Sequence, residues 1–163
     1  MTIIHFQSPS DFPYPTEIVG ENSYQKNIRD VVMYKDMVDS DDMEHRDTQL
    51  TATLILEDNN KYDPGNAVRV EIDGKTVGYL SKEDAFTYRK SLAKKELTNV
   101  VAMCPAVAFG KREEEGKMMK FGIWLGMDVR QLVIDPNPPK KKSCFLFATS
   151  IVLLIVSTLL LLG

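Results

Sequence analysis

Between residues 16 and 130, apolar and polar residues alternate over several short stretches, which is the pattern of strands with one buried face. One such stretch covers residues 50–57 and another covers residues 68–73. The second ends in Asp73 and Gly74, a pair suited to the positive φ angles of a two-residue hairpin turn, and the alternation resumes at residues 76–80. The pattern therefore predicts three strands, of which the last two form a β-hairpin.

A second pair of strands is predicted at residues 100–110 and 117–127, joined by a charged turn. Pro105 within the first of these strands indicates an edge or a bulge. Glycines in both strands indicate bends where a small sheet closes on itself; these are Gly110, Gly122 and Gly126. Many short strands with one or two helices predict a mainly β protein built on a small, strongly curved barrel.

One helix is predicted directly after the hairpin. Ser81 is placed to cap its N-terminus, and Glu83 and Asp84 occupy its first turn, where the helix dipole favours acidic side chains. The apolar side of this helix is formed by Ala85, Phe86, Tyr88, Leu92 and Leu97. A second, short helix is predicted over residues 25–32.

The C-terminal tail argues against a purely soluble protein, because no charged side chain follows Lys142. At a rise of about 1.5 Å per residue, a helix over residues 143–163 is roughly 31 Å long, the thickness of a bilayer's hydrocarbon core. The apolar stretch from Phe145 to Leu162 is therefore predicted to be a single transmembrane helix. The alternative is a buried core helix of a soluble domain.

Basic residues flank this span on its N-terminal side. Lys140, Lys141 and Lys142 precede it, so the positive-inside rule predicts a tail-anchored, single-pass protein whose N-terminal domain lies in the cytosol. The triplet either contacts lipid headgroups or acts only as a stop-transfer flank. Cys144 is either an S-palmitoylation site or a small apolar residue.

The predicted organisation has four parts. Residues 1–15 are expected to be a flexible N-terminus and residues 16–132 the folded β-barrel domain. Residues 133–142 read as a linker rich in proline and lysine, followed by the membrane span at 143–163.

Charge and composition limit the range of functions. The chain has a net charge of −3, and without the three juxtamembrane lysines 17 basic and 23 acidic residues remain, a net charge of −6 for residues 1–139. This acidic balance opposes strong non-specific attraction to nucleic acid or to anionic lipid. The sequence has no glycine-rich phosphate loop, no zinc-protease motif and no nucleophile elbow, and its two cysteines and two histidines lack metal-ligand spacing. We therefore expect neither an enzyme nor a cofactor, and no small-molecule substrate is evident.

Three segments resemble, in the same order, the HIRAN domain: residues 19–25 (VGENSYQ), 56–68 (LEDNNKYDPGNAV) and 77–81 (VGYLS). The middle segment is the most specific, with a glutamate that ends a strand, an asparagine-rich turn, Tyr-Asp-Pro, and Asn-Ala-Val at the start of the next strand. Residues 106–110 and 121–125 also resemble the hairpin that closes this domain. The resemblance covers residue 17 to about residue 130 and implies an OB-like barrel that binds the ends of single-stranded DNA.

The resemblance also implies a set of binding residues. Tyr24 and Tyr62 match aromatic residues of the binding pocket, and Asp63 matches an acidic residue that accepts a hydrogen bond from a terminal hydroxyl. The pocket is expected to include Tyr79 and Asn66 as well. From the residues alone, Asp63 and Asn66 either build the turn or contact a ligand, and Tyr62 either packs back on the domain or stacks on a base.

Three positions differ from the eukaryotic fork remodellers of this family. Asn22 and Ser23 stand where those proteins carry an arginine and a tyrosine, and Tyr79 stands where they carry a histidine. A charge-assisted hydrogen bond to phosphate contributes roughly 1.5–3 kcal/mol, so the missing arginine matters most. Auxiliary basic residues that either compensate or are only solvated charges are Lys26, Lys61 and Arg89.

Two hypotheses from different classes follow. The first is a non-enzymatic module that binds single-stranded nucleic acid at the cytosolic face of a membrane. The second is a protein-interaction domain that recruits a partner, such as a separately encoded helicase or nuclease, to that membrane. The family resemblance favours the first hypothesis, and the acidic balance favours the second.

Overall fold

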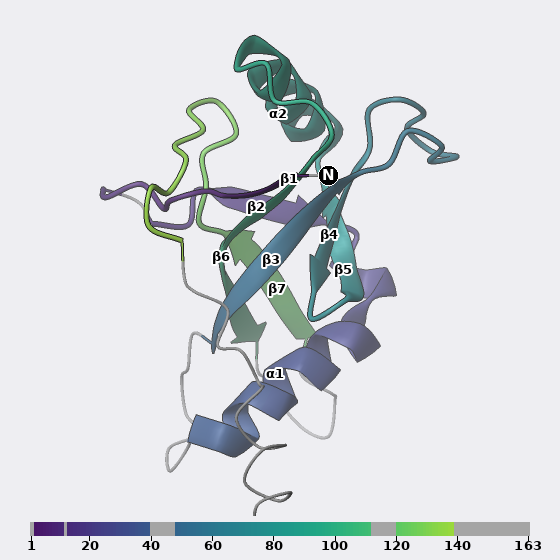
Figure 1. Cartoon of the computed structure of the whole chain (residues 1–163). Coiled ribbons are helices and arrows are strands. Elements are labelled where there is room, and N and C mark those ends of the chain that lie inside the picture. The colour runs from purple at the N-terminus through teal and green to yellow at the C-terminus, as the bar shows by residue number, and fades with distance from the viewer. Residues whose placement is uncertain (1, 12, 40–47, 112–119, 139–163) are drawn as a thin grey trace, which may run out of the picture.

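The structure is a computed structural model that describes residues 2–11, 13–39, 48–111 and 120–138 (Figure 1). The predicted span from Phe145 to Leu162, the lysine triplet and Cys144 lie outside the described residues. Within the described ranges, no helix is both long enough and apolar enough to cross a membrane.

Six strands form a closed barrel, which confirms the mainly β, OB-like architecture predicted from the sequence. They are β2 (Thr16–Val19), β3 (Thr48–Leu56), β4 (Val68–Ile72), β5 (Lys75–Leu80), β6 (Val100–Lys111) and β7 (Lys120–Leu125). Around the barrel the order is β6-β3-β4-β5-β2-β7, and pairing of β6 with β7 closes the ring. All of these neighbours are antiparallel. A seventh strand, β1 (Thr2–His5), pairs parallel with the first part of β6.

The hairpin predicted from the Asp73-Gly74 pair joins β4 and β5. Asp73 has a φ of 49° and Gly74 a φ of 73°, so both residues adopt the left-handed conformation that a tight hairpin turn requires. A register shift between Val70 and Glu71 adds an irregularity to β4 that helps the small sheet to curve.

Pro105 lies where β6 changes partners. On one side of β6, residues 100–103 pair with β1, whereas residues 106–111 pair with β7. The residue that lacks an N–H group therefore lies between the two ladders, and its carbonyl accepts a hydrogen bond from the N–H of Gly126 at 2.6 Å. Pro105 was predicted to indicate an edge or a bulge. It lies at an interruption of the pairing on one side of β6, but β6 is not an edge strand of the sheet.

Two α-helices cover opposite ends of the barrel (Figure 1). Helix α2 (Lys82–Lys94) begins where predicted, since the Ser81 hydroxyl accepts a hydrogen bond from the N–H of Asp84 at 3.0 Å. Helix α1 (Gln25–Asp39) follows a 3₁₀ turn, η1 (Glu21–Ser23), and extends beyond the predicted end at residue 32. Neither glycine nor proline occurs between residues 33 and 39, so nothing in this stretch breaks the helix.

One predicted core residue of α2 is exposed. Ala85, Tyr88 and Leu92 are buried, and the ring of Tyr88 meets that of Phe6 edge-on at 6.2 Å. Phe86, in contrast, is 62% exposed. It lies about 100° around the helix from Ala85, outside the stripe that faces the core, so the prediction for Phe86 is wrong.

The folded unit extends beyond the bounds predicted for it. Instead of a flexible start, residues 2–5 form β1, and Phe6 is only 2% exposed. The N–H of Asp135 donates to the carbonyl of His5 at 2.8 Å, and the N–H of Gln7 donates to the carbonyl of Val133 at 2.9 Å. The first residues of the predicted linker are thus bound to the N-terminal segment.

Strand β2 pairs with β7 only at Trp124 and Leu125. Beyond that point, side chains of η1 and α1 form hydrogen bonds with the β7 backbone instead. The Gln25 amide donates to the carbonyl of Phe121 at 2.8 Å and accepts from its N–H at 2.9 Å. The Glu21 carboxylate accepts from the N–H of Ile123, although burial raises the pKa of Glu21. This arrangement fixes the η1 turn, and with it Tyr24, against the barrel.

Close contact between β2 and β5 predicts a large effect of a small substitution at Gly78. A methyl group on Gly78 would lie 2.7 Å from both the Val19 carbonyl oxygen and the Ile18 Cδ1 atom. We expect Gly78→Ala to lower the free energy of unfolding by about 1–3 kcal/mol, measured by urea denaturation of the full chain in nonionic detergent. Gly122→Ala is the control, because among the described residues no atom other than those of its chain neighbours lies within 4 Å of the added methyl group. Equal stability of the two variants would contradict this packing.

Candidate functional site

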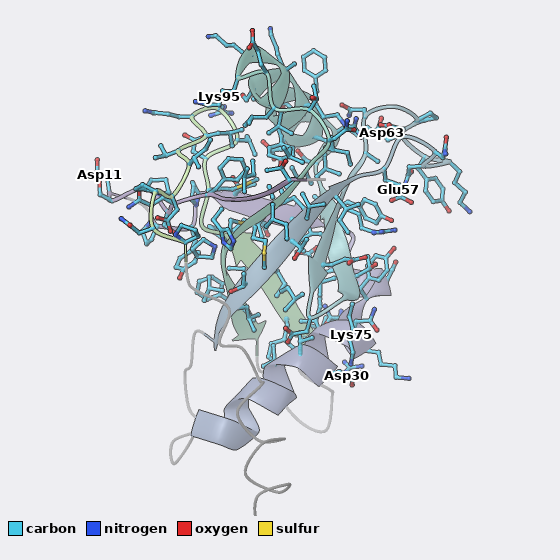
Figure 2. The ribbon with its side chains drawn as sticks, viewed as in Figure 1. Asp11, Asp30, Glu57, Asp63, Lys75 and Lys95 are labelled. Carbon is cyan, nitrogen blue, oxygen red and sulfur yellow. The ribbon has the colours of Figure 1, made fainter. Side chains whose placement is uncertain are left out.

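A pocket of about 520 Å³ opens on the barrel surface beside the loop that joins β3 to β4. It is bounded by the end of β2, the residue after η1, the β3–β4 loop, the end of β5 and the start of α2. Its lining consists of Val19, Tyr24, Glu57, Asn59, Asn60, Lys61, Tyr62, Asp63, Ala67, Tyr79, Leu80 and Lys82. Figure 2 shows Glu57 and Asp63 on the side of the molecule away from Asp11.

The β3–β4 loop, residues 57–67, is braced by its own polar groups. The Asn60 side-chain oxygen accepts from the N–H of Tyr62 at 2.9 Å and from that of Asp63 at 3.2 Å, as in an Asx turn. The N–H of Gly65, whose φ is +74°, donates to the carbonyl of Asp58 at 2.8 Å. Asn66 donates to Asp63 Oδ2 at 2.7 Å. The loop therefore holds its shape through hydrogen bonds in which the side chain of Tyr62 takes no part.

Arg89 of α2 binds this loop from outside the pocket. Its guanidinium donates to the carbonyls of Asn66 and Ala67 and to the carboxylate of Asp58, each at 2.8 Å. The Asn66 amide also donates to the carbonyl of Lys82 at 3.1 Å. Arg89 and Asn66 are thus placed to attach the loop to α2, and neither lines the pocket.

Three tyrosines from separate segments meet in the pocket. Tyr62, at the loop tip, is 74% exposed, and the Lys61 ammonium lies 4.5 Å from the centre of its ring. Tyr62 therefore does not pack back on the domain. The rings of Tyr24 and Tyr79 lie 6.2 Å apart at an angle of 47°. The exposed ring of Tyr62 can thus stack on a ligand, and the rings of Tyr24 and Tyr79 form another part of the pocket lining.

Tyr79 belongs to a polar network of pocket-lining residues. Burial raises the pKa of its phenol, and hydrogen bonds with Tyr24 and Glu57 raise it further, so the phenol is neutral throughout the physiological pH range. The Glu57 carboxylate lies 3.8 Å from the Arg69 guanidinium, whose Nε atom is 3.1 Å from Glu71. Glu57 is therefore partly neutralised from outside the pocket.

The remaining charges of the pocket are those of Asp63, Lys61 and Lys82. The two lysines are exposed, which suits contacts with a phosphate. The Asp63 carboxylate accepts one hydrogen bond, from Asn66, and no other donor of the described residues contacts it. This carboxylate can accept a further hydrogen bond from a hydroxyl of a ligand.

The structure brings together Tyr24, Lys61, Tyr62, Asp63 and Tyr79, which were predicted from the sequence. It does not bring Lys26 to them, since Lys26 is an exposed residue of α1 that does not line the pocket. The hydrogen bond from Lys75 lowers the pKa of Asp30, and the charge of Lys26 adds to this effect. Sequence reasoning missed further lining residues, namely Glu57, Asn59, Asn60 and Lys82. Glu57, Asn59 and Asn60 lie within four residues of one another, in the segment whose sequence was predicted to form the binding loop. Their closeness to Tyr62 and Asp63 in the sequence was the signal that could have identified them. Lys82 gave no local signal.

Within the described ranges, no group of three or more histidine, cysteine, aspartate or glutamate side chains is placed to hold a metal ion. Comparisons of the chain with protein-family models, with curated proteins and with solved structures found no match. The chemistry of the pocket is therefore the basis for assigning a function.

The bonds made by Arg89 lead to a prediction about the loop. Arg89→Met removes three hydrogen bonds and keeps most of the aliphatic stem, so we expect a loss of about 1–3 kcal/mol in the free energy of unfolding and faster proteolysis within residues 57–67. Urea denaturation and limited proteolysis measure the two effects. Lys90→Met is the control. Lys90 follows Arg89 in the sequence and is exposed, so its replacement should change neither the free energy of unfolding nor the rate of proteolysis. If Arg89→Met matches this control, the guanidinium does not hold the loop.

Proposed function

We propose that this protein binds the end of a single-stranded nucleic acid in the pocket and catalyses no reaction. The observation that carries the proposal is the meeting of Tyr24, Tyr62 and Tyr79, from three distant segments, around one opening that also contains Asp63. Aromatic side chains on which bases stack, combined with basic groups for the backbone, are the general means of single-strand recognition. The resemblance to the HIRAN domain supports the same function, and we propose that the barrel is related to that family.

The pocket suits one terminal nucleotide. Its volume of about 520 Å³ lies within the usual range of ligand pockets, roughly 300–1,000 Å³. In the proposed complex the terminal base stacks on Tyr62, and the terminal hydroxyl donates to the Asp63 carboxylate. Lys61 and Lys82, which both line the pocket, contact the adjoining phosphate.

The charge of the pocket favours a free hydroxyl over a phosphate at the terminus itself. Asp63 accepts from a hydroxyl but repels a phosphate placed at the same point. Among the residues that the structure describes, no arginine lines the pocket, and the two nearby arginines have other partners: Arg89 binds the loop and Arg69 lies beside Glu57 and Glu71. We therefore expect affinity in the micromolar range and strong dependence on salt.

Fluorescence anisotropy with labelled single strands tests this proposal. The full chain in nonionic detergent at low salt should bind a strand with a free 3′ hydroxyl more tightly than the same strand with a 3′ phosphate. Absence of binding to either strand at about 100 μM protein, a limit corresponding to roughly −5.5 kcal/mol, would refute nucleic-acid recognition. Equal binding of the two strands would refute the role of Asp63 in recognising the terminus.

A second candidate function is recruitment of a protein partner, such as a helicase or nuclease. The observation that favours it is the net charge of −6 over residues 1–139, which disfavours a polyanionic ligand. The two functions differ in salt dependence: single-strand binding weakens steeply as salt rises, by a logarithmic slope of roughly −0.7 per phosphate contacted.

We also propose that the tail anchors the domain at the cytosolic face of a membrane, as the apolar stretch from Phe145 to Leu162 and the preceding lysines suggest. In Figure 1 the last described residues lie on the side of the barrel away from the β3–β4 loop. In a membrane-anchored protein, this placement would keep the pocket accessible from the cytosol.

A further inference from the structure

Helix α2 carries an exposed row of side chains that the proposed pocket does not explain. Lys82, Phe86, Lys90 and Lys94 are spaced by four residues, so they follow one another along a single ridge of the helix. All four are exposed, and Phe86 is 62% exposed. We call this row the α2 ridge. Most of this large aromatic side chain is in contact with solvent rather than packed in the core.

The α2 ridge begins at the pocket. Lys82 lines the opening, and its carbonyl accepts the hydrogen bond from Asn66. Arg89, on the neighbouring part of the helix, bonds to the loop at three points. The ridge and the pocket are therefore rigidly connected, and from Lys82 to Lys94 the ridge runs roughly 18 Å at about 1.5 Å per residue.

The electrostatic character of the ridge is basic. Across the part of the chain that the structure describes, none of the three lysines is within ion-pairing distance of a carboxylate. The Asp84 carboxylate accepts a hydrogen bond from the Ser81 hydroxyl, which leaves Glu83 as the acidic residue on the exposed side of the first turn. The ridge thus carries three lysines that form no ion pair among the described residues, and one aromatic residue.

We infer that the α2 ridge binds the nucleotides that follow the end held in the pocket. One base stacks on Phe86, and the phosphates beyond it along the helix contact Lys90 and then Lys94. This inference rests on the proposed function and extends it, because it gives the protein a footprint of several nucleotides and a path for the strand. A single phenylalanine among lysines is too small an apolar surface for docking a protein helix, whereas stacking with flanking cations suits a single strand.

A length series tests the inference. With the full chain in nonionic detergent, Phe86→Ala should weaken binding of an eight-nucleotide strand by roughly 5- to 150-fold, the effect of about 1–3 kcal/mol per stacked base, and leave binding of a dinucleotide unchanged. Replacing Lys90 and Lys94 by glutamine should reduce the logarithmic salt slope for the longer strand by about 1.4. Glu83→Gln should strengthen binding of the eight-nucleotide strand, because it removes a negative charge beside the ridge.

Lys75→Gln is the matched control, because Lys75 pairs with Asp30 at the α1 end of the barrel (Figure 2) and should leave both strand lengths unaffected. If Phe86→Ala and the lysine variants bind the longer strand as the wild type does, while Tyr62→Ala weakens both lengths, the ridge has no part in binding but the pocket function stands. If polyglutamate competes equally well and Phe86→Ala has no effect, the ridge is a site for acidic protein segments. If the wild type binds neither strand, both the ridge and the pocket proposals fail.

Discussion

Tyr62→Ala is expected to weaken binding of a single-strand end by roughly 5- to 150-fold, since stacking on an aromatic side chain contributes about 1–3 kcal/mol per base. Tyr62 is 74% exposed, and the hydrogen bonds that shape its loop are made by Asn60, Asp63 and Asn66. Removing the ring therefore deletes a stacking surface while the loop keeps its conformation. Anisotropy titrations at constant salt measure the change.

Tyr62→Phe is the control for this variant. It keeps the ring and removes only the hydroxyl, so binding should stay close to that of the wild type. The free energy of unfolding should be nearly equal for the wild type and both variants, because an exposed side chain contributes little to folding. If Tyr62→Ala binds as tightly as Tyr62→Phe, the strand does not stack on this residue.

Removal of residues 143–163 is expected to move the protein completely from the membrane fraction to the soluble fraction. The deleted segment contains no charged residue and consists mostly of leucine, isoleucine, valine and phenylalanine, each of which favours insertion by about 0.3–0.6 kcal/mol. Extraction of membranes with alkaline carbonate, followed by sedimentation, measures the distribution.

A variant with Lys140, Lys141 and Lys142 replaced by serine separates anchoring from headgroup attraction. It should still sediment with the membrane, because the hydrophobic span alone is sufficient for insertion. Release of the full-length protein by carbonate would show that residues 143–163 do not span the bilayer.

The barrel was predictable because most of its strands are indicated by local sequence patterns. Alternation over residues 50–57 and 68–73 and the Asp73-Gly74 turn depend only on neighbours in sequence, and the structure confirms each of them. The N-terminal strand was missed for the opposite reason. Thr2–His5 is short, and it is held by β6 and by residues near Asp135, partners that no local pattern reveals.

The candidate site was predictable to the extent that it lies in contiguous segments. Tyr62 and Asp63 occupy a turn with a distinctive sequence, and the resemblance to a known family placed Tyr24 and Tyr79 beside them, where the structure also has them. Arg89 was predicted from its charge either to assist ligand binding or to be only a solvated charge. Its actual contacts with Asp58, Asn66 and Ala67 depend on how α2 packs against the loop, which charge alone does not indicate.

Photocrosslinking tests the central claim, that the end of a single strand lies in the pocket. A strand whose 3′-terminal base is replaced by 5-iodouracil is irradiated with the full chain in detergent, and the modified peptide is identified by mass spectrometry. The crosslink is expected at Tyr62, with Tyr24 or Tyr79 as secondary positions, and it should be lost when unlabelled strand with a free 3′ hydroxyl competes. A crosslink confined to α1 or to the β6–β7 surface, or none above that of a strand labelled at its 5′ end, would contradict the claim.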